Sequence, residues 1–72
     1  MNMTENIKNT VYTLRTKKGL TQEDLAEKVG ITRQTVISIE KGNYTPSVLL
    51  ALKISTVFKV PVEDICQISY GK

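Results

Sequence analysis

The chain has 72 residues, of which 40% are hydrophobic, so it can form one domain with a small core. It contains one cysteine and no histidine, which excludes a disulfide framework, imidazole catalysis and most zinc sites. With no glycine-rich phosphate loop either, we expect no enzyme, no cofactor and no metal. The net charge of +3 is compatible with nucleic acid. Neither a membrane-spanning apolar run nor a signal-peptide layout is present, so we expect a cytoplasmic protein.

The N-terminal residues 1–8 alternate between apolar and polar side chains, which favours a short strand. A frayed tail or an early start of the first helix is the alternative. That helix is predicted from Asn9 or Thr10, as its cap, to about Lys18, and Gly19 ends it.

The stretch from residue 22 to residue 41 predicts two short helices with a tight turn between them. Thr21 is placed to cap the first helix together with Asp24. A buried stripe then follows at one-turn spacing, and Gly30 ends the helix. That stripe consists of Leu25, Ala26 and Val29.

The second helix of this stretch is predicted to begin after Thr32 and to end at Gly42, with Val36 and Ile39 on its inner face. A small residue, Ala26, lies where two steeply crossing helices would approach, and a glycine lies where the chain reverses. This spacing is typical of a DNA-binding helix-turn-helix, whose second helix enters the major groove. The alternative is a helical hairpin that only packs a core.

A fourth helix is predicted from Ser47 to about Phe58, after a loop that ends at Pro46. Its apolar residues cover more than one stripe, so we expect it at the centre of the core. They are Val48, Leu49, Leu52, Ile54 and Val57. Residues 62–65 would add one turn at most, and residues 66–70 alternate again. The two alternating terminal segments could therefore pair as an antiparallel ribbon, supported by the helices or by a second subunit.

Several motifs together resemble those of the Cro/C1-type (XRE) helix-turn-helix family, over about residues 10–65. They are Leu14-Arg15, Gly19-Leu20-Thr21-Gln22, Leu25-Ala26, Thr32-Arg33-Gln34-Thr35-Val36, Ile39-Glu40-Lys41-Gly42 and Tyr44-Thr45-Pro46-Ser47. The resemblance implies a single domain over residues 1–72. Its fold would be all-α, a five-helix lambda-repressor-like DNA-binding domain, with terminal extensions at 1–8 and 66–72 that form strands in some members.

The resemblance also implies roles for individual residues. The base edges would be read by Arg33, Gln34, Ile37 and Ser38, in keeping with the match of arginine to guanine and glutamine to adenine. The phosphates would be held by Gln22, Thr35, Lys41, Asn43 and Tyr44. Gln22 would also brace Gln34, and Arg15 and Glu40 would form a partly buried salt bridge.

Each role has a structural alternative. Gln22 could be a helix former after its cap, Arg33 and Gln34 solvated helix residues, and Lys41 a partner of the helix dipole. Tyr44 could pack on the fourth helix. Ile37 replaces a small polar residue of the family, and we favour contact with a thymine methyl over burial. Cys66 replaces an aromatic residue and could loosen that end of the core.

We therefore expect a sequence-specific regulator of double-stranded DNA, most simply a homodimeric repressor that reads an inverted repeat through residues 33–41. We expect no membrane partner and no small-molecule effector. An antitoxin of a toxin–antitoxin pair is the nearest alternative. A protein-bridging module with the same fold is another, and it predicts an apolar surface patch and no requirement for Arg33 and Gln34.

Overall fold

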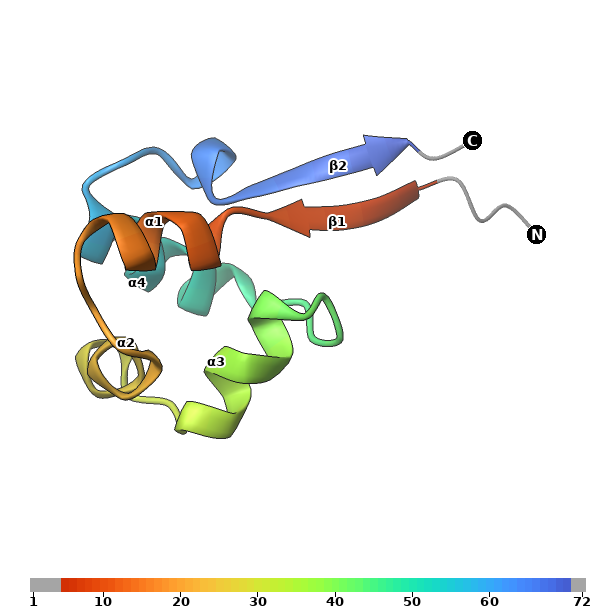
Figure 1. Cartoon of the computed structure of the whole chain (residues 1–72). Coiled ribbons are helices and arrows are strands. Elements are labelled where there is room, and N and C mark those ends of the chain that lie inside the picture. Colours follow the sequence, from red (N-terminus) through yellow and green to blue (C-terminus); the bar gives the residue numbers. More distant parts are fainter. Residues whose placement is uncertain (1–4, 71–72) are drawn as a thin grey trace.

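A computed structural model of the chain describes residues 5–70, and the side chains of residues 9–67. The described part is mostly helical, with a two-stranded ribbon at one edge (Figure 1). In chain order its elements are β1 (Glu5–Asn9), α1 (Val11–Lys17), α2 (Gln22–Val29), α3 (Arg33–Glu40), α4 (Val48–Phe58), the 3-10 turn η1 (Val62–Asp64) and β2 (Cys66–Tyr70). Within residues 5–70 there are thus four α-helices, and the expected fifth helix is a single 3-10 turn. None of the helices in the described part has the length and apolar character needed to cross a membrane.

The two terminal segments pair as an antiparallel ribbon. Glu5 lies opposite Tyr70, and Asn9 lies opposite Cys66. In Figure 1 the two strands run side by side and project beyond the helices. The first strand was expected at residues 1–8, and the structure has it at 5–9, while residues 1–4 lie outside the described residues. The ribbon is joined to the helices where the backbone N–H of Thr10 donates to the carbonyl of Ile65 at 3.0 Å.

The predicted caps Thr21 and Thr32 are found at the starts of α2 and α3. Thr21 Oγ1 accepts from the N–H of Asp24, and an Asp24 oxygen accepts from the N–H of Thr21, which together form a capping box. Thr32 caps α3 by accepting from the N–H of Thr35 at 3.1 Å. Gly30 ends α2 in the left-handed conformation at φ 77°, which glycine adopts without steric cost.

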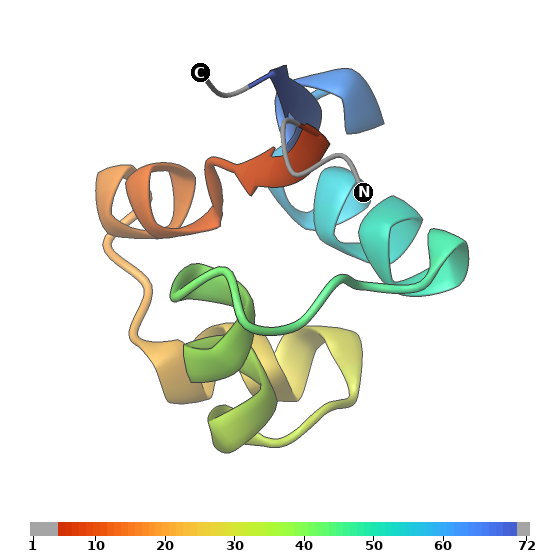
Figure 2. The same cartoon turned by 90° about the vertical axis from the view of Figure 1, so that its right-hand side faces the viewer.

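Residues from all four helices form a small apolar core, and Figure 2 shows how these helices are arranged. The predicted inner faces of α2 and α3 are buried in this core. The inward face of α4 and Ile65, which follows η1, complete it. Its buried members are Val11, Leu25, Ala26, Val29, Val36, Ile39, Leu50, Ile54, Phe58 and Ile65.

The prediction for α4 was wrong in part, because three of its large apolar residues face outward. Val48 is 77% exposed, Leu49 64% and Leu52 47%. The helix instead buries the face that carries Leu50, Ala51, Ile54, Ser55 and Phe58. Since apolar residues occur on both faces of this helix, its periodicity does not indicate which face enters the core.

Candidate nucleic-acid interface

Helix α3 presents its first turn to the outside of the molecule. Val36 and Ile39 on its inner face are each 1% exposed, so they fix the rotation of the helix against α2 and α1. Arg33 and Gln34, which open the helix, are both exposed. The outward face of the first turn therefore offers a guanidinium and a carboxamide that are free to bind another molecule.

The charge on this segment is positive. The six residues from Arg33 to Ser38 include one arginine and no acidic residue, while the acidic residues Glu23, Asp24 and Glu27 belong to α2. A helix with exposed polar groups and no acidic residue near its start can approach a polyanion without repulsion. It also has the width that the major groove of DNA admits.

Ile37 and Ser38 are half-buried, so they are less accessible than Arg33 and Gln34. Ile37 is neither sealed in the core nor fully exposed, which leaves part of its surface available for an apolar contact. The carbonyl of Ser38 accepts from the N–H of Asn43 at 2.9 Å and thereby holds the loop against the end of the helix. Thr35 is half-buried, and its hydroxyl lies 2.9 Å from that of Thr32.

The loop after α3 places further polar groups at the surface. Lys41, Asn43 and Tyr44 are all exposed. Tyr44 is 45% exposed, yet it also lines a shallow hollow together with Leu49 and Lys53 of α4. Tyr44 therefore lies beside α4 while much of its surface is accessible, so its two predicted roles are compatible.

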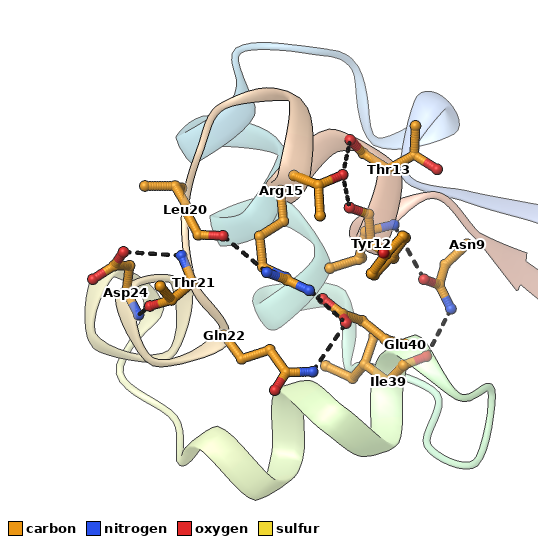
Figure 3. A network of polar contacts seen from close by, with 12 residues as sticks. Asn9, Tyr12, Thr13, Arg15, Leu20, Thr21, Gln22, Asp24, Ile39 and Glu40 are labelled. Atoms are coloured by element: carbon orange, nitrogen blue, oxygen red, sulfur yellow. Dashed lines mark hydrogen bonds and ion pairs between the residues drawn. The ribbon is translucent and has the colours of Figure 1, made fainter.

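A buried ion pair joins α1 to the last turn of α3 (Figure 3). Arg15 Nε donates to Glu40 Oε2 at 2.6 Å and Nη2 donates to Oε1 at 3.1 Å, a two-bond geometry that suits arginine and carboxylate. Arg15 Nη1 also donates to the carbonyl of Leu20 at 2.8 Å. The hydrogen bond to Glu40 raises the pKa of Arg15 above its usual value. The predicted salt bridge between Arg15 and Glu40 is thus present.

The predicted contact between Gln22 and Gln34 is absent from the described residues. Gln22 Nε2 instead donates to Glu40 Oε1 at 3.2 Å (Figure 3). A carboxylate is a stronger acceptor than a neutral amide, and Gln34 is exposed at the start of α3. Since the amide nitrogen carries two hydrogens, one N–H of Gln22 remains free for another acceptor.

Asn9 supports α3 in a way that the sequence did not indicate. Its Nδ2 donates to the carbonyl of Ile39 at 2.9 Å, and its Oδ1 accepts from the N–H of Val11 at 3.2 Å (Figure 3). Asn9 therefore binds the first N–H of α1 and also ties the end of β1 to the end of α3. Of the two predicted caps, Thr10 stands at the N-cap position, and its side chain makes no cap bond to the helix. No local signal could have revealed the second contact, because its partner lies thirty residues away in the chain.

The chain is similar in sequence and in fold to known helix-turn-helix proteins. Residues 11–65 match the protein-family model described as Helix-turn-helix, HTH_3. The chain is 56% identical over 59 residues to YgzD of Bacillus subtilis (strain 168), an uncharacterized HTH-type transcriptional regulator, with 82% of this chain and 89% of that protein covered. It is 29% identical over 52 residues to the cryptic phage CTXphi transcriptional repressor RstR of Vibrio cholerae, with coverages of 72% and 47%.

Among solved structures, the fold is similar to that of the restriction-modification controller protein C.AhdI from Aeromonas hydrophila. The TM-score is 0.70 and the identity is 35%, over 75% of this chain and 82% of that chain.

Proposed function

Because the chain belongs to the Cro/C1-type (XRE) family of helix-turn-helix transcriptional regulators, we propose that it is a homodimeric, sequence-specific repressor. The observation that carries this proposal is the presentation of Arg33 and Gln34 on the first turn of a helix whose opposite face is locked in the core. The similarity to RstR, a transcriptional repressor, supports repression rather than activation.

In this proposal α3 enters the major groove and its first turn reads the bases. Arg33 donates to the O6 and N7 atoms of a guanine, and Gln34 exchanges two hydrogen bonds with an adenine. Ile37 contacts a thymine methyl with its accessible part, and Ser38 bonds to a neighbouring base edge. Arg33 and Gln34 carry most of the discrimination because both are exposed and each can make two bonds to one base.

The phosphates on both sides of the groove are bound by groups around α3. Gln22 offers its free amide hydrogen, and Thr35 offers its hydroxyl. Lys41, Asn43 and Tyr44 hold the backbone beyond the end of α3. These contacts fix the register of the helix on the duplex and carry no sequence information themselves.

Two copies of the chain would read an inverted repeat whose half-sites lie about one helical turn, roughly 34 Å, apart. Repression then follows from occupation of promoter DNA. We propose that residues 1–72 act as one domain, with residues 10–65 as its core.

Fluorescence anisotropy with DNA from upstream of the protein's own gene, against a scrambled duplex at two salt concentrations, tests the proposal. We expect a preference of about a thousandfold or more for one duplex and weaker binding to both at higher salt. Equal affinity for both duplexes, repeated with a pool of selected genomic fragments, would contradict sequence-specific binding.

One observation favours a second candidate function, a protein-bridging module, namely the exposed apolar residues on α4. The two functions differ in their need for the first turn of α3. If the double substitution of Arg33 and Gln34 by alanine left regulation in the cell intact, the bridging function would replace the repressor proposal.

A further inference from the structure

A basic groove lies on the side of the molecule where the ends of α1 and α2 meet α4. Two adjoining hollows form it, with volumes of about 410 Å³ and about 450 Å³, and Lys28 and Val57 line both of them. The lining of the first hollow also includes Lys18 and Leu20, and that of the second includes Lys53. We call the two hollows together the lysine groove. In Figure 1 the loop from α1 to α2 lies at the left edge of the molecule, and α3 lies to the right of it.

The lysine groove carries a net positive charge. Lys18, Lys28 and Lys53 are all exposed, and the acidic residue in the described lining is Glu27. Among the side chains that the structure describes, none of these lysines forms an ion pair. The carboxylate of Asp24, one helical turn before Lys28, is bonded to a backbone N–H instead. The groove therefore offers its positive charge to an anionic ligand.

The floor of the lysine groove is apolar, which indicates the kind of anion that it suits. Leu20 and Val57 are half-buried between the exposed lysines of the rim. A free phosphate or a nucleic-acid backbone would neutralise the ammonium groups and leave this apolar surface in contact with water. An acidic protein segment that also carries an apolar side chain would cover it, and removal of apolar surface from water is favourable.

The size of the lysine groove is compatible with such a segment. Each of its two hollows falls within the range of about 300–1,000 Å³ that is typical of ligand pockets. A side chain of leucine size can therefore enter a hollow while the acidic residues on either side of it remain at the rim.

The lysine groove is separate from the candidate DNA-reading face. Arg33, Gln34 and Lys41 line neither of its hollows. A partner in the groove therefore leaves these three side chains accessible. A DNA-bound copy of the chain can thus hold an acidic protein beside the same duplex.

We propose that the lysine groove binds an acidic segment of another protein. The carboxylates of the segment pair with the three lysines of the groove, and an apolar side chain of the segment covers Leu20 and Val57. This binding requires neither DNA nor a second copy of the chain, so the inference goes beyond the proposed function.

NMR titration of the isotope-labelled protein with an acidic peptide, in the absence of DNA, tests this inference. The probe is a peptide of six glutamates and two leucines, and in the reference peptide serine replaces both leucines. We expect the probe to shift the amide signals of Lys28, Gly30 and Val57, with little change at Arg33 and Gln34. We expect the reference peptide to bind about tenfold more weakly or less, because it buries no apolar side chain.

Two outcomes of the titration would overturn the inference. Equal affinity for the two peptides would show that the groove selects anions in general, such as phosphates, and not an acidic protein segment. The largest shifts at Arg33 and Gln34 would show that the peptide binds the candidate DNA-reading face. Because DNA is absent, neither outcome bears on the proposed repressor function.

Charge variants locate the peptide independently of the shifts. Lys28→Glu reverses a charge that both hollows share, and we expect it to raise the Kd of the probe by about tenfold or more. Glu27→Gln removes the carboxylate from the lining and should lower that Kd. The matched control is Lys41→Glu, at an exposed residue outside the groove, which should change the Kd less than threefold. Circular dichroism establishes that the variants are folded. An equal loss of affinity in Lys28→Glu and Lys41→Glu would overturn the inference, because the peptide would then respond only to net charge.

Discussion

Arg15 and Glu40 join the first and third helices through a 2.6 Å bond between Nε and Oε2, with side chains that are only 9% and 7% exposed. The bond closes a separation of 25 residues and fixes the end of α3 relative to α1. It also engages the one carboxylate of α3, which would otherwise be repelled by a phosphate. The pair is therefore part of the scaffold that positions the candidate DNA-reading helix.

Replacement of Glu40 by glutamine keeps the side-chain volume and removes the charge. The buried guanidinium of Arg15 then loses its charged partner, and we expect the free energy of unfolding to fall by about 3 kcal/mol. Urea denaturation followed by circular dichroism measures the change.

The matched control for this change is Glu23→Gln, at an exposed residue of α2, which should alter stability by less than about 0.5 kcal/mol. In addition, the double variant Arg15→Met, Glu40→Leu should be more stable than Glu40→Gln, because no unpaired charge remains buried. Equal stabilities of Glu40→Gln and Glu23→Gln would show that the ion pair contributes nothing.

Replacement of Gln34 by alanine removes a proposed base contact. We expect a loss of about 1–3 kcal/mol in binding to the preferred duplex and little change with the scrambled one. Competition anisotropy with duplexes that differ at single base pairs measures the effect. Specificity should relax at one position of each half-site. A uniform loss at all positions would assign Gln34 to the phosphates instead.

Replacement of Lys41 by alanine should weaken binding to every duplex by a similar factor. If Lys41 contacts one phosphate, the slope of log affinity against log salt should become shallower by about one unit. The control is Lys28→Ala, which removes the same charge from a residue that lies beside Val57 of α4. An equal change of slope in both variants would indicate a general effect of net charge rather than a contact at Lys41.

The elements that the sequence predicted well are those with local signals. Thr21 with Asp24, Thr32 and Gly30 each act within a few residues of their own position, so their spacing is sufficient to locate both ends of α2 and the start of α3. The end of α3 was expected at Gly42, and the helix ends at Glu40. The inner face of α3 was equally clear, since Val36 and Ile39 are its obvious apolar pair.

The features that the sequence did not predict depend on contacts between distant residues. Asn9 binds the carbonyl of Ile39, and Gln22 binds Glu40 rather than Gln34. No periodicity encodes such a choice of partner. The prediction of the buried face of α4 failed for a different reason, because a helix that is apolar on two faces buries only one of them against its own domain.

Protonation of the Asp24 carboxylate should make the stability of the protein depend on pH at acidic pH. Its carboxylate accepts from the N–H of Thr21 at 2.9 Å, and this bond holds the pKa of Asp24 below its usual value. The resulting stabilisation is present above the usual carboxyl pKa of about 3.9 and is lost as the pH falls through the lower folded-state pKa. The stability difference between wild type and Asp24→Asn should therefore be largest near neutral pH and shrink below about pH 4.

Thermal unfolding of both proteins across this pH range measures the effect. The control is Glu27→Gln, the same charge change on the same helix at an exposed residue. If the difference between wild type and Asp24→Asn stayed constant with pH, the bond to Thr21 would not be linked to ionisation.

Lys59 ends α4 in an unfavourable backbone conformation, and its replacement by glycine should stabilise the protein. Its φ is 58°, and it is the non-glycine residue with positive φ among the residues that the structure describes. A side chain in the left-handed region costs about 1 kcal/mol, which glycine avoids. We expect Lys59→Gly to raise the free energy of unfolding by somewhat less, because glycine loses more entropy on folding.

The same substitution at Lys53 supplies the matched comparison. Lys53 is exposed in the middle of α4, so Lys53→Gly removes the same charge but should destabilise the helix by about 1 kcal/mol. Urea denaturation measures the change in the free energy of unfolding of each variant. If this change is positive for Lys59→Gly and negative for Lys53→Gly, the backbone conformation at Lys59 is the cause. Destabilisation by both would mean that Lys59 is not left-handed in solution, and that α4 ends through another arrangement.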